Sequence, residues 1–211
     1  AASGDAAGNY NITIQGSTTA NITAKSVTLN APQVSREYDG TANYTVNVSQ
    51  LSALSSQLGV AGDNVTAIAL VYNDKNAAPI KTLTGSNAVI SDGNSGNNYT
   101  ITYASNSTST ISRAALSVTG VSTSVTYTGL AQTNGVASLS GVQGSDSFTI
   151  SGYGTGTNYS ATAYADNLLA TPASGTSASN YTITYTNGGI SIGKAGLVVT
   201  ADNKTRFYGD A

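Results

Sequence analysis

The side chains of this chain that could do acid–base chemistry are almost all aspartates. Its 211 residues include no histidine, no cysteine, one glutamate (Glu37) and nine aspartates. General acid–base catalysis needs a proton carrier of suitable pKa, most often a histidine or a perturbed carboxylate. Five aspartates stand beside or near glycines, where an Asx turn is the expected role: Asp39, Asp63, Asp92, Asp146 and Asp210. Serines are plentiful but have no histidine to act as their base, so we expect no catalytic site and no enzymatic activity.

One polar loop could attract a metal ion. Residues 92–98 offer oxygen atoms of the kind that a hard cation such as calcium accepts. The loop lacks the carboxylate spacing and the closing glutamate of an EF-hand, and the matching residues 173–180 contain no aspartate. We therefore expect a plain loop there, and neither a metal nor any other cofactor in this chain.

The charge content is low and excludes several classes of partner. Charged residues make up 9% of the chain, against roughly 25% in ordinary soluble domains. The net charge of −2 provides no basic field for nucleic acid or anionic lipid. No apolar run approaches the roughly 18 residues of a membrane span, so no membrane insertion is expected of this segment. The absence of cysteine excludes disulfides and thiolate metal sites.

Tyrosines are the remaining candidates for a binding site. A tyrosine ring can stack on a ligand while its hydroxyl hydrogen bonds. Tyr153, Tyr159 and Tyr164 lie close together in the sequence, where the earlier part of the chain has fewer aromatics. If they point to solvent in one shallow groove, they predict a glycan-binding or other ligand-binding site. If Tyr153 and Tyr159 are buried in the core, that hypothesis fails.

The elements that must position these side chains follow from an internal repeat. The phrase NYTITY occurs at residues 98–103 and 180–185, and the similar NYNITI begins at residue 9. The tyrosines of these phrases lie 89 and 82 residues apart, about the length of a small domain. After each phrase comes an isoleucine, and 16 residues after that isoleucine stands another tyrosine: Tyr38, Tyr127 and Tyr208. A GV-x-G turn begins 40 residues before the tyrosine of each NYTITY phrase.

The repeat predicts four segments along the chain. Residues 1–22 are expected to form the last strands of one module, residues 23–111 a complete module, residues 112–192 a second, divergent module, and residues 193–211 the start of a further module. The chain is thus expected to be cut from a longer tandem array. The joints span only a few residues, so neighbouring modules should keep a limited range of orientations. Each joint holds a basic residue that we expect to be solvated: Lys25, Arg113 and Lys194.

Each module is predicted to be mainly β. Tyr99, Ile101 and Tyr103 alternate with threonines, which is typical of a half-buried strand. The polar residues 104–110 are expected to form a hairpin connection that returns through Ile111. We predict small antiparallel modules, either β-grasp-like or immunoglobulin-like sandwiches, with at most one short helix each and arranged as a rod.

One helix is expected over residues 49–58. Leu51, Leu54 and Leu58 follow the i, i+3, i+7 spacing of an apolar helix face. Ser49 is the predicted N-cap, and Gly59 is expected to end the helix. The corresponding part of the second module is seven residues shorter, so we expect the helix to be lost or shortened there.

The order of landmarks also indicates a family. These are Tyr38-Asp39-Gly40-Thr41, the GV-x-G turn and Asn98-Tyr99-Thr100-Ile101, and together they resemble the YDG-type repeats. The end of the chain, with Tyr208-Gly209, resembles the opening of the MBG repeats and their YG signature. Both families occur as tandem arrays in large filamentous-haemagglutinin-like bacterial adhesins. The second module departs from the pattern, with Tyr127-Thr128-Gly129 in place of YDG.

The resemblance implies a bacterial cell-surface location and a stalk role, with no catalytic or ligand residues to carry over. The leading hypothesis is therefore a structural segment of a secreted adhesin, which projects a distal binding domain or builds a fibre for cell adhesion or biofilm. Its partners would be the neighbouring modules of the same chain. One alternative is a module that binds host or environmental glycans, or other cells, through its tyrosines. Another is self-assembly, in which an incomplete module accepts a strand from the next chain.

Overall fold

The structure of the protein is a computed structural model that describes residues 13, 16 and 20–209. It is mainly β, as the sequence predicts, with one α-helix in the described residues. The predicted strands of residues 1–22 lie largely outside the described part, and residues 20–24 form no strand. No helix of the described residues is long and apolar enough to cross a membrane.

The N-terminal half, residues 25–112, contains two sheets and the helix. Strand β1 (Lys25–Asn30) pairs with β6 (Tyr99–Ala104), and the second sheet has the order β2-β7-β5-β4-β3. Its strands are β2 (Ser35–Glu37), β3 (Asn43–Tyr44), β4 (Asn64–Tyr72), β5 (Ala78–Ser91) and β7 (Asn106–Ser112). Both sheets and the helix turn apolar side chains into one buried cluster, which includes Leu29, Leu54, Leu70, Leu83 and Ile111.

Helix α1 (Val48–Ser56) confirms the predicted helix but corrects its cap. The N-cap is Asn47, whose Oδ1 accepts from the Gln50 backbone N–H at 2.9 Å, while the Gln50 side chain accepts from the Asn47 backbone N–H at 3.0 Å. This reciprocal pair is a capping box. Ser49 lies inside the first turn and its hydroxyl donates to Asn47 Oδ1, so the prediction of Ser49 as N-cap was wrong. The chain leaves the helix through Gly59, whose φ of +66° favours glycine.

The C-terminal half, residues 114–193, is built from shorter strands. Its sheets have the orders β11-β8-β16, β14-β17-β9, β12-β15 and β10-β13. The strands are β8 (Ala114–Gly120), β9 (Ser122–Thr126), β10 (Gln132–Thr133), β11 (Ala137–Ser140), β12 (Phe148–Ser151), β13 (Thr155–Gly156), β14 (Tyr164–Ala165), β15 (Leu169–Pro172), β16 (Tyr181–Thr186) and β17 (Gly189–Gly193). Residues 127–141 contain no α-helix, which confirms that the helix is lost where the chain is shorter.

The first and last strands of each half pair in parallel, which corrects the prediction of antiparallel modules. In the N-terminal half β1 lies parallel to β6 and β2 parallel to β7. In the C-terminal half β8 lies parallel to β16 and β9 parallel to β17. The remaining pairs are antiparallel.

The predicted hairpin at residues 104–110 was also wrong, because most of this stretch is strand β7 in the other sheet. Backbone hydrogen bonds continue between the sheets, from Ala31 N to Ala104 O and from Thr110 N to Val34 O, each 2.9 Å. The opening and closing segments therefore pass from one sheet to the other side by side. Since they run in the same direction, the chain enters this half at one end and leaves at the opposite end.

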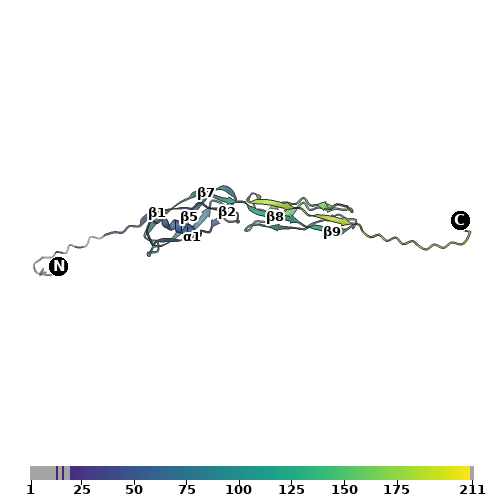
Figure 1. Cartoon of the computed structure of the whole chain (residues 1–211), viewed down its shortest axis with the longest axis horizontal. Coiled ribbons are helices and arrows are strands. Elements are labelled where there is room, and N and C mark those ends of the chain that lie inside the picture. Colours follow the sequence, from purple (N-terminus) through teal and green to yellow (C-terminus); the bar gives the residue numbers. More distant parts are fainter. Residues whose placement is uncertain (1–12, 14–15, 17–19, 210–211) are drawn as a thin grey trace.

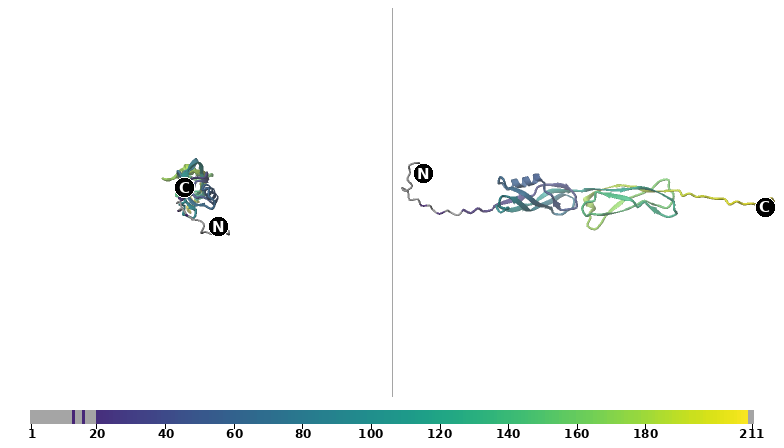
Figure 2. Two further views of the ribbon diagram at one scale, coloured as in Figure 1. Left: turned by 90° about the vertical axis from the view of Figure 1, so that its left-hand side faces the viewer. Right: turned by 90° about the horizontal axis from the view of Figure 1, so that it is seen from below.

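The two halves lie one after the other along the longest axis of the molecule (Figure 1). In the view along that axis they overlap (Figure 2, left). Strand β7 ends at Ser112 and β8 begins at Ala114, so only Arg113 separates the halves. Residues 194–209 extend beyond the far end of the C-terminal half without a strand or helix.

Candidate functional site at the junction of the two halves

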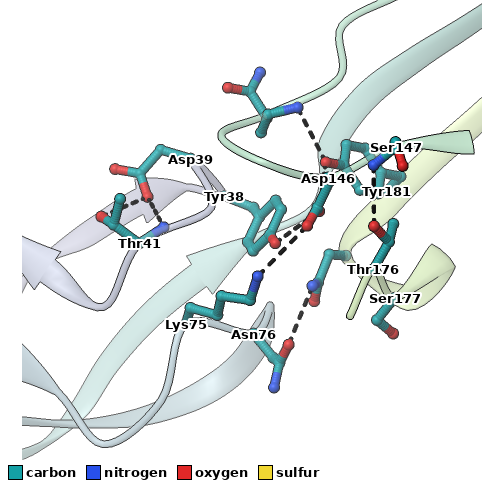
Figure 3. A network of polar contacts seen from close by, with 12 residues as sticks. Tyr38, Asp39, Thr41, Lys75, Asn76, Asp146, Ser147, Thr176, Ser177 and Tyr181 are labelled. Atoms are coloured by element: carbon teal, nitrogen blue, oxygen red, sulfur yellow. Dashed lines mark hydrogen bonds and ion pairs between the residues drawn. The ribbon is translucent and has the colours of Figure 1, made fainter. Parts of the chain in front are cut away.

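A buried carboxylate joins the two halves. Asp146, in the loop between β11 and β12, is 7% exposed. Its Oδ2 accepts hydrogen bonds from the hydroxyls of Tyr38 (2.8 Å) and Tyr181 (2.7 Å), as Figure 3 shows. The Lys75 ammonium lies 3.4 Å from Oδ1. Tyr38 and Lys75 come from the N-terminal half and Tyr181 from the C-terminal half, so we call these four residues the Asp146 cluster.

Each member of the Asp146 cluster is held by its own element. Tyr38 follows β2, and its backbone N–H donates to Ser112 O at the end of β7 (2.9 Å). Lys75 stands in the turn between β4 and β5, and Tyr181 opens β16. The Tyr181 hydroxyl also accepts from the Gln143 backbone N–H at 3.0 Å, which ties it to the Asp146 loop. The polar groups are thus positioned by backbone from both halves.

Aromatic packing surrounds these hydrogen bonds. The Tyr38 and Tyr181 rings meet edge to face with centroids 5.5 Å apart, and Phe148 meets Tyr181 in the same way at 5.3 Å. Such pairs contribute about 0.5–1.5 kcal/mol beyond their buried area. Leu116 and Tyr181 of the C-terminal half belong to the buried apolar cluster of the N-terminal half. The junction is therefore a continuous core and not a hinge of exposed residues.

The electrostatics favour a charged aspartate between neutral tyrosines. Burial by itself would raise the pKa of Asp146, but hydrogen bonds from Tyr181 and Tyr38 and the charge of Lys75 outweigh it and lower the pKa below the usual value. Burial, together with the hydrogen bond to Asp146 and its negative charge, raises the pKa of Tyr181 to about 12. The pKa of Tyr38 is raised for the same reasons. At neutral pH both tyrosines are donors to the carboxylate.

Two further contacts cross the junction. Asn180, fully buried, accepts at its Oδ1 from the Ala77 backbone N–H (2.9 Å) and donates from Nδ2 to Asn76 Oδ1 (3.1 Å). Gly40 packs against Gly144, so that a Cβ added to Gly40 would lie 3.1 Å from the Gly144 Cα. Gly40 also has a φ of +83°, so two reasons require glycine at this place. The hydrogen bonds of the Asn180 amide and the close packing of the Gly40 and Gly144 backbones both restrict the angle between the two halves.

The expected Asx turns are confirmed at two aspartates and wrong at two others. The Thr41 backbone N–H donates to Asp39 Oδ1 and the Asn94 backbone N–H to Asp92 Oδ1, each at 2.9 Å. Asp39 also forms an ion pair with Arg36 on its own side of the junction. By contrast, the Asp146 and Asp63 carboxylates accept distant tyrosine hydroxyls. Asp210 lies outside the described residues.

The structure places the three predicted ligand-binding tyrosines in different surroundings. Tyr153 is half-buried against the small cluster of Val118, Leu168 and Ala170. Tyr164 is half-buried beside Gly156, and its hydroxyl donates to Asn158 O at 3.1 Å. Tyr159 is 49% exposed, and the Lys194 ammonium lies 4.9 Å from its ring centroid. Their shared role in glycan binding stays a prediction.

Only Tyr159 of these three lines a surface pocket of about 470 Å³, with Tyr127, Asn158, Lys194, Ala195, Gly196 and Leu197. The other basic joint residues also have neighbours. The Lys25 ammonium donates to Leu58 O at 2.6 Å although Lys25 is exposed, and Arg113 lines a separate pocket with Ile111. The solvated role predicted for these residues therefore holds for Lys25 only in part.

The loop considered for a metal ion uses its carboxylate for its own backbone. Asp92 accepts from the backbone N–H groups of Gly96 (2.8 Å), Asn94 and Asn98, and these bonds lower its pKa. Within residues 20–209, no three His, Cys, Asp or Glu side chains are grouped so that they could hold a metal.

One short sequence in the C-terminal half has the pattern of a nucleophile motif. Residues 189–193 read GISIG, which has the letters of the G-x-S-x-G hydrolase motif. Ser191 lies in the middle of β17 and not at a strand-to-helix turn, so the geometry of a nucleophile elbow is missing.

The comparison with known families assigns part of the chain. A YDG domain lies at residues 23–109. Tyr38 and Lys75 of the Asp146 cluster fall within this YDG domain, whereas Asp146 and Tyr181 follow it. No curated protein and no solved structure matches the chain.

Sequence reasoning missed the Asp146 cluster, although a signal for it exists. In each half an aspartate shortly after the GV-x-G turn bonds the tyrosine of NYTITY. Asp63 and Tyr99 lie 36 residues apart, and Asp146 and Tyr181 lie 35 apart. A paired Asp and Tyr that recur at nearly equal spacing indicate a repeated contact, whereas each aspartate taken alone predicts only a turn.

Proposed function

We propose that this chain is a structural stalk segment of a secreted bacterial surface adhesin. In this proposal the two halves are tandem β modules, with boundaries near residues 23, 112 and 193, which form a rod that projects a distal binding region from the cell. No enzymatic activity is assigned to it. The YDG domain at residues 23–109 and the resemblance of the landmarks to adhesin repeats support the extracellular setting.

The observation that carries this proposal is the parallel pairing of the first and last strands in each half. An antiparallel pair would return the chain to the end at which it entered. A parallel pair passes it to the opposite end, so that each added module extends the molecule. The one-residue connection at Arg113 preserves this direction from one half to the next.

The same pairing suits a segment under tension. A pull on the two ends acts along β1 and β6, or along β8 and β16, and the hydrogen bonds of a parallel pair are evenly spaced along the strands. These bonds must then yield together and not one by one. The Asp146 cluster adds buried hydrogen bonds at the junction, where neighbouring modules would otherwise bend.

Small-angle scattering together with the mass in solution tests the proposal. The chain should be a monomer, and a longer variant with a second copy of residues 23–111 inserted before residue 23 should gain maximum dimension by about one module length. A longer variant whose modules fold back on one another would contradict the stalk. Polymers of the purified chain would favour self-assembly by strand exchange instead.

A further inference from the structure

The N-terminal half contains a second tyrosine–aspartate pair with the geometry of the junction. The Tyr99 hydroxyl donates to Asp63 Oδ2 at 2.5 Å, as Tyr181 donates to Asp146 Oδ2 at 2.7 Å. Tyr99 opens β6, which lies parallel to β1, and Tyr181 opens β16, which lies parallel to β8. The two pairs therefore occupy the same place in the two halves, at the end where the chain enters.

The two pairs differ in the residues that contact their carboxylates. Asp146 receives Tyr38 and Lys75 from the preceding half, whereas in the described residues the Asp63 carboxylate accepts a side-chain hydrogen bond from Tyr99 alone. Asp63 is half-buried and lines a surface pocket of about 540 Å³ together with Lys25, Val60, Asn98 and Tyr99. At the junction the corresponding space is filled by the N-terminal half.

Two neighbouring positions show the same contrast. Val142, after Gly141, packs against the apolar cluster at the junction, but Val60, after Gly59, is 45% exposed. Asn180 is fully buried between Asn76 and the Ala77 backbone. Asn98, its counterpart before Tyr99, is exposed, and among residues 20–209 its side chain bonds only within its own loop, to Asn94 and to Asp92 O.

We infer that Val60, Asp63, Asn98 and Tyr99 form a docking surface for a preceding module of the same kind as residues 23–111. This inference rests on the proposed function, because it requires modules in tandem. The occupant presents a YDG-type tyrosine to Asp63 and a lysine beside it, as Tyr38 and Lys75 are presented to Asp146. The Asp63 carboxylate can accept from that tyrosine hydroxyl and pair with that ammonium, and the exposed Val60 can make the apolar contact that Val142 makes at the junction.

The far end of the C-terminal half carries an exposed tyrosine that complements this docking surface. Tyr127 follows Ile111 at the spacing by which Tyr38 follows Ile22, and it lies at the end of the C-terminal half where the chain leaves. Tyr127 is 42% exposed, whereas Tyr38, covered by the next half, is 1% exposed. The exposed Tyr127 at one end and the half-buried Asp63, which lines a surface pocket, at the other allow the same joint to repeat.

The test uses the full chain with a second copy of residues 23–111 inserted between residues 22 and 23. The upstream copy then presents its Tyr38 and Lys75 to Asp63 and Tyr99 of the downstream copy. The chain has no cysteine, so Ser52→Cys in each copy places two spin labels on the exposed face of α1. Pulsed electron spin resonance should give a single narrow distance, because the new joint is held as the natural one is.

Asp63→Ala in the downstream copy should abolish the narrow distance, and Tyr38→Phe in the upstream copy should also broaden it while leaving the docking surface intact. The matched control is Asp63→Ala in the upstream copy, which faces no added module and should leave the distance unchanged. A broad distance in the unsubstituted chain, or a narrow one that survives both substitutions, would overturn the inference.

A second label pair separates this outcome from failure of the proposed function. In the unextended chain, labels at Ser52→Cys in the N-terminal half and Ser151→Cys in the C-terminal half report on the natural junction between them. Both serines are exposed. Suppose that this distance is narrow and broadens with Asp146→Ala, while the distance across the new joint is unchanged by Asp63→Ala. The proposed stalk is then retained and the docking surface is rejected. If the distance across the natural junction is itself broad, the proposed stalk is rejected.

Discussion

The two halves share the path of their terminal strands but fill their interiors differently. The N-terminal half packs α1 and a five-stranded sheet around a large apolar cluster. Away from the junction, the C-terminal half has the small cluster of Val118, Leu168 and Ala170, together with the buried Ile190 and Ile192 of β17. It gains order from Asp166, 3% exposed, which accepts from the Asn134 amide (2.8 and 3.0 Å) and from the backbone N–H groups of Gly154 and Gly188.

This difference shows which structural features the two halves share. The parallel terminal strands and the Tyr–Asp pair occur in both halves, and at the junction the pair of Tyr181 and Asp146 contacts the preceding half. The helix, the long hairpin of β4 and β5 and the size of the core vary. A buried carboxylate that is fully hydrogen bonded can replace apolar packing as the feature that specifies one arrangement.

The largest effect should come from truncating the larger core. Leu83→Ala removes a fully buried side chain of β5 and is expected to cost about 2–5 kcal/mol of unfolding free energy. Leu168→Ala, the same change in the small cluster, should fall at the lower end of that range because fewer apolar neighbours are lost. Urea denaturation followed by circular dichroism measures both. Equal losses would contradict the contrast between the two interiors.

The next effect should come from the polar interior of the C-terminal half. Asp166→Ala removes the acceptor of two glycine N–H groups and leaves the Asn134 amide with Val121 O as its remaining acceptor. This should cost about 3 kcal/mol, since an unpaired buried group costs about 1–3 kcal/mol. Chemical denaturation of the variant measures this loss. The control is Asp202→Ala, at an exposed position, which should stay within about 0.5 kcal/mol of the parent. A loss as small as that of the control would show that apolar packing alone specifies this half.

The junction should weaken at both extremes of pH. The folded-state pKa of Asp146 lies below the ordinary 3.8, so its contribution is present above that value and is lost as the pH falls through the folded pKa. The pKa of Tyr181 is raised from 10.0 to about 12, so its contribution is present below pH 10 and is lost as the pH rises toward 12. Thermal unfolding across these ranges, with tyrosinate absorbance at the alkaline end, measures both effects.

The Asp146→Asn variant is the control for the acid range. It should be less stable than the parent at neutral pH, and the difference should shrink as the pH falls below 3.8 through the lowered folded-state pKa of Asp146, because the parent then loses its carboxylate charge. A constant difference down to the lowest pH would mean that the Asp146 charge does not stabilise the junction.

The smallest effect should come from the helix that only the N-terminal half contains. Asn47→Ala removes the acceptor for the Gln50 N–H and should cost about 1 kcal/mol. Ser49→Ala, two residues later, should change the stability by less than about 0.5 kcal/mol. Denaturant midpoints of the two variants compare them. The reverse order would restore Ser49 as the cap.

The sequence by itself determined the local structure and the family of the first half. Alternation in Tyr99, Ile101 and Tyr103 and the leucine spacing of α1 specify which faces are buried, because side-chain periodicity is a local property of strands and helices. The landmarks around Tyr38 lie within the YDG domain found at residues 23–109. The loss of the helix in the second half followed from a shorter chain.

Only the tertiary structure decided how these pieces meet. Alternation says which face of a strand is buried but not which strand lies beside it, so the parallel pairing of β1 with β6 could not be predicted. The same limit applies to Asp146, because a local pattern of aspartate and glycine predicts a turn. Its partner Tyr38 lies 108 residues away, and a hydrogen bond over that separation exists only once two halves have folded and packed together.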